Sequence, residues 1–128
     1  MRKITDHIVS GDQAVQLEIT VADEPGAGGA NHCYQISGVN EESNPSNGYA
    51  ALPRILFQNG SIKEAGVNGI TQEALAAIII DRLRSFQAGP YACADNEEAL
   101  NHFVQGLRSL QNRTRTRINR GVEGTHTV

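Results

Sequence analysis

Four arginines lie between residues 113 and 120, in the stretch RTRTRINRGVEGT, although the chain as a whole has a formal net charge of −3. At roughly 100° per helical residue, Arg113, Arg117 and Arg120 fall within an arc of about 60°, and Arg115 points to the opposite side. A guanidinium is a planar fork that matches phosphate oxygens, and three like charges on one stripe repel one another unless an anion or a carboxylate relieves them. The spacing fits an anion site, or equally a solvated helix end whose cations complement the C-terminal dipole.

Composition narrows the kind of anion that this stripe would bind. A mildly acidic chain is a poor general polyanion binder, because such a protein neutralises many phosphates over a long track. A small anion therefore fits better than a nucleic acid. The N-terminal residues lack the pattern of a leader, and no apolar run approaches the roughly 20 residues of a membrane span, so we expect a soluble, cytoplasmic protein without membrane contact.

Cysteine and histidine give little support for a metal or a disulfide. Cys33 and Cys93 are far apart and form no CxxC motif, and the four histidines show no metal-ligand spacing. We expect reduced thiols, no metal and no cofactor. The 128 residues predict one domain, in which a β-rich part (1–69) precedes a helical hairpin (70–121) and a tail (122–128).

The N-terminal part predicts a small antiparallel sheet. Between Gln13 and Val21, apolar and polar residues alternate with the period of a half-buried strand. A glycine-rich stretch, PGAGGAN (25–31), lacks the lysine and the following helix of a P-loop, and is interpreted as a flexible connection to a second strand at 32–37. A polar loop follows at 40–47, and 50–57, which contains a proline, predicts an edge strand.

The first predicted helix follows Asn68-Gly69. Thr71 is the predicted N-cap, and the helix should end before Gly89-Pro90. Apolar residues at helical spacing define its predicted buried face: Leu75, Ile78, Ile79, Leu83 and Phe86.

The second predicted helix begins at Asp95, with Glu98 three residues later in an acidic variant of the capping box, and Gly121 is a left-handed cap at its end. Its apolar stripe extends over about six turns: Leu100, Phe103, Leu107, Leu110, Thr114 and Ile118. The arginines should then flank this packing stripe.

A connection of only about seven residues predicts an antiparallel helical hairpin with a long last helix, and so an α+β fold overall. Phe86 would lie near the hairpin turn and could stack on a nucleobase, although such a phenylalanine more often belongs to a core. The arginines would lie about 25 to 35 Å from the turn at 1.5 Å per residue, so one site could use both only in an oligomer.

The segments LFQNGSIKEAGVNGITQEALAAIIIDRLRSFQAGPYACADNEEAL and RTRTRINRGVEGTHTV resemble the phage Thoeris anti-defence sponge family, whose hairpin is shared with anti-CBASS sponge proteins. The resemblance covers about the last 75 residues. It implies a non-enzymatic protein that sequesters cyclic nucleotide immune signals in the cytoplasm of an infected bacterium. The implied signals are cyclic ADP-ribose isomers such as glycocyclic ADP-ribose and, in some members, cyclic di- or trinucleotides. It also implies a homo-oligomer, commonly a hexamer assembled from hairpin dimers.

The resemblance also implies roles for individual residues. Phe86 corresponds to an aromatic face, Asn96 to an amide contact, and Arg113 and Arg117 to phosphate contacts. Asn96 could equally be a helix cap. Two further candidates, Arg120 and Glu123, lie in the segment RGVEGT (120–125), and Glu123 could simply pair with an arginine.

Two other classes of protein compete with a sponge. An enzyme that degrades the same nucleotides would need a base, a metal or a nucleophile beside the arginines, where only Glu123 and His126 are near in sequence. A small nucleic-acid-binding hairpin would need an extended basic surface and would bind with steep salt dependence. No catalytic residue is predicted, and no nucleic acid is expected as a partner.

Overall fold

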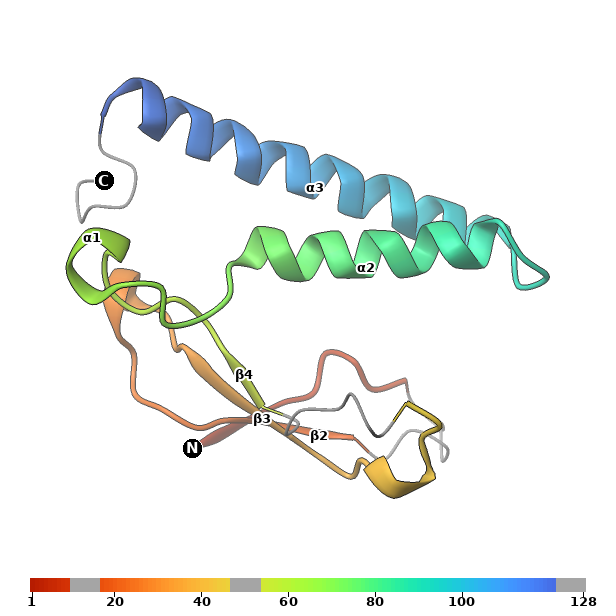
Figure 1. The fold of residues 1–128 in the computed structure, drawn as a ribbon. Helices are drawn as coiled ribbons and strands as arrows, with labels where there is room; N and C mark the ends of the chain where they lie inside the picture. The colour runs from red at the N-terminus through yellow and green to blue at the C-terminus, as the bar shows by residue number, and fades with distance from the viewer. Residues whose placement is uncertain (10–16, 47–53, 122–128) are drawn as a thin grey trace. The chain divides into compact units, whose positions relative to one another are not determined.

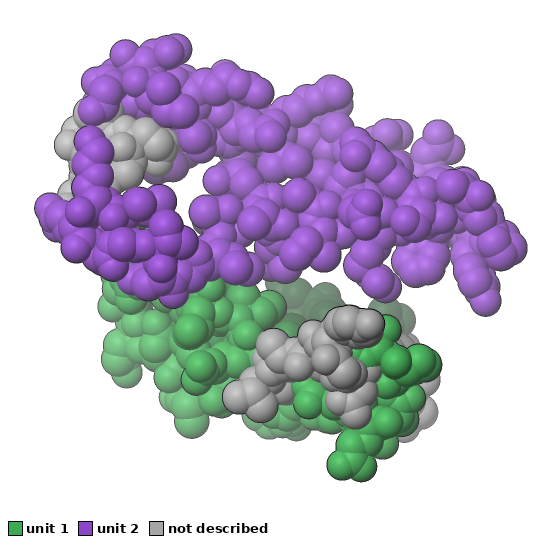
Figure 2. Space-filling view, in the orientation of Figure 1, with its two compact units in different colours: residues 1–60 green, residues 61–128 purple. Residues whose placement is uncertain are grey.

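The computed structural model describes residues 1–9, 17–46 and 54–121. Four short strands are followed by one short and two long helices, which confirms the predicted α+β class (Figure 1). The chain forms two compact units, residues 1–60 and residues 61–128 (Figure 2). The first contains the sheet and the second the helices, and each is described by itself.

The sheet in the first unit has the strand order β1-β2-β3-β4 with antiparallel pairing throughout. The strands span Arg2–Ile4 (β1), Glu18–Val21 (β2), Cys33–Ser37 (β3) and Arg54–Leu56 (β4). The predicted pairing of the two central strands is confirmed, and β4 lies at an edge, as expected. Residues 13–16 and 50–53 of the predicted strands lie outside the described residues.

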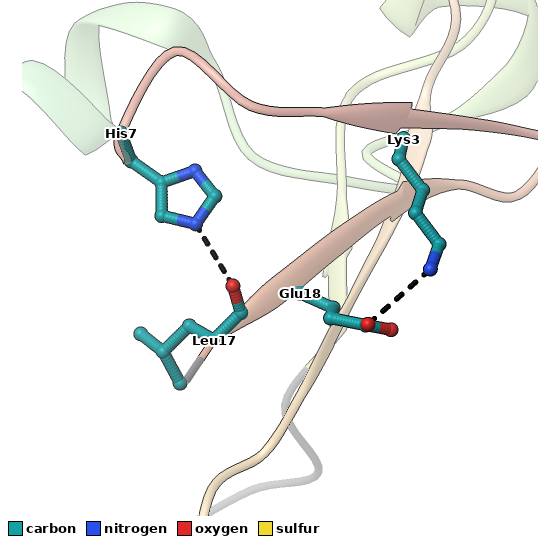
Figure 3. Close-up of polar contacts among 4 residues, drawn as sticks. All are labelled: Lys3, His7, Leu17 and Glu18. Carbon is teal, nitrogen blue, oxygen red and sulfur yellow. Dashed lines mark hydrogen bonds and ion pairs between the residues drawn. The ribbon is translucent and has the colours of Figure 1, made fainter. Parts of the chain in front are cut away.

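The core of this unit begins at Val21, whose side chain is 2% exposed. The alternation along β2 turns Val21 inward and leaves Glu18 exposed, and Glu18 forms an ion pair with Lys3 of β1 at 3.2 Å (Figure 3). In the same close-up, Nε2 of His7 lies 2.9 Å from the carbonyl oxygen of Leu17. These contacts hold β1, which the sequence did not predict, against β2.

The glycine-rich stretch differs from the flexible connection that was predicted, because it is folded. It contains a 3₁₀ turn, Ala27–Gly29, and a hydrogen bond from the Gly26 N–H to the carbonyl of Ala30 at 2.7 Å. The Ala27 N–H donates to the side-chain oxygen of Asn59 at 3.2 Å. A partner far along the chain therefore fixes this loop.

Asp23 closes the connection between β2 and β3. Its carboxylate accepts hydrogen bonds from the backbone N–H groups of His32, at 3.0 and 3.1 Å, and of Cys33, at 3.1 Å. Burial alone would raise the pKa of this carboxyl, but the two N–H donors and the nearby imidazole of His32 favour the charged form, and the pKa lies below its ordinary value.

The second unit is dominated by the predicted helical hairpin, which packs α2 (Gln72–Gln87) against α3 (Ala94–Asn119). A short helix, α1 (Ile62–Ala65), precedes them. The predicted N-cap of the first long helix is confirmed, since the Thr71 hydroxyl accepts from the N–H of Ala74 at 3.1 Å. At the other end, Gly121 has the positive φ of 73° expected of a left-handed cap.

The predicted N-cap of the second long helix, Asp95, is wrong by two residues. Cys93 is the N-cap, and its Sγ accepts from the N–H of Asn96 at 3.4 Å. Asp95 lies inside the first turn, where its charge still complements the helix dipole. The earlier start has a local cause, because Gln87 at the end of α2 accepts a hydrogen bond from the Cys93 N–H at 3.1 Å and fixes the turn.

The packing faces of the two helices also differ in part from the prediction. On α2 the buried residue is Ile80, at 3% exposed, whereas Ile78 is 56% exposed. On α3 the stripe continues from Thr114 to Arg117, which is only 7% exposed, whereas Ile118 is 58% exposed. The stripe therefore follows a three-residue step here instead of the predicted four-residue step. Arg117 is thus a buried residue, and not an open residue on the flank of the stripe as predicted.

Candidate functional site

Three side chains cluster where α2 runs into the hairpin turn. The guanidinium carbon of Arg82 lies 5.5 Å from the centroid of the Phe86 ring, in the geometry of a cation–π contact. The Tyr91 ring meets Phe86 edge-on, with centroids 6.4 Å apart and planes at 87°. Phe86 is 38% exposed and Tyr91 is 74% exposed, so aromatic surface remains open at this end of the hairpin.

Asn96 belongs to the same end of the hairpin. Its side-chain nitrogen donates to the backbone carbonyl of Tyr91 at 3.3 Å, and its own N–H donates to Cys93. Asn96 is thus tied to the cap of α3 without being the cap residue. The structure brings Phe86 and Asn96 together, because both contact Tyr91.

The arginines lie at the far end of α3. Arg113 is exposed, Arg117 is buried, and Arg120 is the C-cap residue, whose N–H donates to the carbonyl of Thr116 at 3.1 Å. Glu123 lies outside the described residues. The predicted stripe therefore contains two exposed arginines, Arg113 and Arg120, and one buried arginine, Arg117.

The helix lengths separate these two groups of residues. From Asn96 to Arg113 the axis of α3 rises about 25 Å, and to Arg117 about 32 Å, at about 1.5 Å per residue. Since α3 has 26 residues and α2 has 16, α3 continues past the first residue of α2 by about ten residues, and this extension carries the arginines (Figure 1). One small molecule cannot contact both groups in a single hairpin.

Two members of the turn cluster, Arg82 and Tyr91, were not among the candidates from sequence. The spacing from Arg82 to Phe86 is i to i+4, which places the two side chains on one helix face and could have indicated the contact. Tyr91 offers a second signal, because it is one of only six aromatic residues and lies in a six-residue turn between Gln87 and Ala94.

Two other features, a metal site and a membrane-spanning helix, can be checked in the described ranges. Within residues 1–9, 17–46 and 54–121, no three His, Cys, Asp or Glu side chains are grouped so that they could hold a metal ion. In the same ranges, no helix is both long and apolar enough to cross a bilayer.

The fold and the residues at the two ends of the hairpin define the class of the protein. It contains a helical hairpin with an aromatic and amide cluster at the turn and arginines at the far end of the long helix. Residues 50–114 match the family model of the Acb2/Tad1 hairpin domain. The matched range includes Phe86, Asn96 and Arg113 and ends before Arg117. The chain belongs to this family, and the family prediction made from its sequence is confirmed.

A curated relative supports the same assignment. Over 75 residues the chain is 41% identical to the protein named Thoeris anti-defense 1 of Bacillus phage SBSphiJ7. The alignment covers 59% of this chain and 53% of the relative, so the chain matches about half the length of that protein.

Proposed function

We propose that this protein is a phage anti-defence protein that binds a cyclic nucleotide immune signal and sequesters it without cleaving it. The observation that carries the proposal is the cluster of Phe86, Tyr91 and Asn96 at the hairpin turn, which combines open aromatic surface with an amide inside the part of the chain that matches the Acb2/Tad1 hairpin domain. The name of the similar Bacillus phage protein, Thoeris anti-defense 1, supports the anti-defence role.

The ligand would be a cyclic ADP-ribose isomer such as glycocyclic ADP-ribose, with cyclic di- or trinucleotides as further candidates. An adenine base can stack on an aromatic ring, an interaction worth about 1 to 3 kcal/mol. Arginine guanidiniums bind phosphate oxygens through paired, charge-assisted hydrogen bonds. Arg113 and Arg117 would hold the phosphates, and Arg120 and Glu123 would line or support the same pocket.

A complete pocket requires at least two copies of the chain. Because about 25 Å of helix lies between Asn96 and Arg113, the turn of one hairpin would meet the arginines of a second hairpin packed antiparallel to it. Exposed apolar side chains on α2 and α3, among them Ile78 and Phe103 at 56% and 41% exposed, supply surface for such a contact. Dimers of this kind would assemble further, up to a hexamer, as the family resemblance implies.

The chemistry of the proposed ligand contacts supports binding without cleavage. Aromatic rings, an amide and guanidiniums would hold the base and its phosphates, and none of them is a strong general base or nucleophile at neutral pH. Glu123, the one carboxylate proposed for the pocket, would pair with an arginine. The protein would act by mass action in the cytoplasm of the infected bacterium, removing the signal before a host receptor binds it. The rival function is an enzyme that degrades the same nucleotides.

The test is native mass spectrometry of the full chain incubated with an equimolar mixture of glycocyclic ADP-ribose, cyclic dinucleotides and cyclic trinucleotides. The proposal predicts an oligomer that retains one of these nucleotides with its mass unchanged. An oligomer that retains none of them, or a nucleotide of altered mass, would contradict the proposal.

A further inference from the structure

The most exposed aromatic ring of the helical unit is Tyr91, in the described part of the chain. Its side chain is 74% exposed, although it lies in the turn between α2 and α3 and its ring meets Phe86 edge-on. A large aromatic ring left open to water contributes little to packing, because burial is what makes an aromatic side chain stabilising. The position of this ring therefore calls for an explanation outside the fold of the hairpin.

The turn does not need the Tyr91 ring to keep its shape. The hydrogen bond from Asn96 goes to the backbone carbonyl of Tyr91, and the bond that closes the turn joins Gln87 to the Cys93 N–H. Neither bond uses the side chain of Tyr91, so we expect both to persist when only that side chain is changed. The ring is thus held on a fixed backbone and can be removed without dismantling its support.

The surroundings of the ring suit a flat, electron-rich ligand group. The planes of Tyr91 and Phe86 stand at 87° to each other, so a base lying flat on Tyr91 would present its edge to the Phe86 ring. Arg82 already covers the Phe86 ring at 5.5 Å. Of the two rings at the hairpin turn, Tyr91 is therefore more accessible to a ligand than Phe86.

On this geometry we propose that Tyr91 is a ligand-contact residue on which the nucleobase stacks, with Phe86 as the perpendicular wall and Arg82 as the positioning residue that holds Phe86. The inference rests on the proposed nucleotide-binding function and adds the residue that recognises the base. A purine is the chemical group expected in this corner, since a two-ring base covers more of the tyrosine face than a pyrimidine does.

The test is a series at one position, with Tyr91→Phe, Tyr91→Leu and Tyr91→Ala titrated calorimetrically with glycocyclic ADP-ribose. Tyr91→Phe keeps a flat ring and should bind within about threefold of the wild type, since stacking is retained. Tyr91→Ala should bind about 5- to 150-fold more weakly, the range that removal of one stacked ring produces. Tyr91→Leu should resemble Tyr91→Ala, because it retains apolar volume without a π face.

Three outcomes would overturn the inference, and one separates it from the proposed function. Tyr91→Ala binding as tightly as the wild type would remove Tyr91 from the site. Equal affinities of Tyr91→Leu and Tyr91→Phe would mean that apolar volume, and not stacking, is what the ligand uses. Weaker binding accompanied by a smaller particle in light scattering would assign the ring to the contact between copies. If the wild type itself binds no cyclic nucleotide, the proposed function fails and the inference falls with it.

Discussion

Arg113 and Arg117 stand one helical turn apart on α3, and their different burial predicts different responses to the same substitution. Arg113 is exposed, whereas Arg117 is 7% exposed. Arg113→Ala should therefore affect ligand binding alone. Arg117→Ala should affect both binding and the stability of the fold, because it removes a buried side chain together with its packing and polar contacts.

The magnitudes follow from the kind of interaction that is lost. A hydrogen bond to a charged group contributes about 1.5 to 3 kcal/mol, so each substitution should weaken binding about 10- to 150-fold. An exposed substitution changes the free energy of unfolding by less than about 0.5 kcal/mol, which corresponds to about 2 °C in Tm. Loss of a buried arginine should cost about 2 kcal/mol, or about 6 to 10 °C for a chain of this size.

Isothermal titration with glycocyclic ADP-ribose and differential scanning calorimetry measure the two quantities separately. Arg115→Ala is the matched control, since it removes the same charge from the opposite side of α3 and should alter neither affinity nor Tm appreciably. If the two single variants, Arg113→Ala and Arg117→Ala, both bind the nucleotide as tightly as the wild type, the proposed arginine site is refuted. An unchanged Tm for Arg117→Ala would refute the packing role assigned to its side chain.

Three further predictions concern the fold and the assembly. Leu110→Asp places a charge on the packing stripe of α3 and should both reduce the particle mass in light scattering and weaken nucleotide binding; an intact, fully binding oligomer would contradict this. The lowered pKa of Asp23 means that its carboxylate stabilises the folded state above its ordinary pKa and that this stabilisation is lost as the pH falls through the folded value. Asp23→Asn should therefore melt below the wild type at pH 7, with the gap closing toward pH 3, and a gap that is constant with pH would contradict the assignment. Gly106→Ala, with open space around the added methyl, should raise stability by about 0.5 to 1 kcal/mol, whereas Gly121→Ala, at φ 73°, should lower it by about 1 kcal/mol; equal Tm shifts would be inconsistent with both backbone conformations.

The sequence predicted the elements whose signals are local and periodic. The alternation that ends at Val21 and the cap at Thr71 both depend on residues within a few positions, and both are found in the structure. The start of α3 was harder to predict, because Cys93 is an uncommon N-cap and its position depends on Gln87 across the turn.

Features that depend on distant partners could not be read from local patterns. The glycine-rich loop is shaped by Asn59, which lies 32 positions from its partner Ala27. After Thr114, the buried stripe could continue three residues later at Arg117 or four residues later at Ile118. The hydrophobicity of Ile118 favoured the second position in the prediction, but the buried residue is Arg117.

Only some of the residues that the structure groups at the hairpin turn were candidates from the sequence. Asn96 and Phe86 were candidates because of the family resemblance, and the structure brings them to one end of the hairpin. Tyr91 contacts Phe86 through its ring and accepts a hydrogen bond from Asn96 at its backbone carbonyl. Neither contact produces a periodic pattern in the sequence that could have predicted it.

The central claim, sequestration without cleavage, is tested most directly by titrating the protein into a fixed amount of glycocyclic ADP-ribose and reading the activity of a receptor that this nucleotide activates. With micromolar protein, a dissociation constant near 1 nM, or about −12 kcal/mol, would hold the free nucleotide below the level that the receptor needs. Under sequestration, receptor activity should fall in proportion to the protein added and return in full, with a nucleotide of unchanged mass, after the mixture is heated to unfold the protein. Loss of activity at substoichiometric protein, followed by recovery of a cleaved nucleotide after heating, would contradict it.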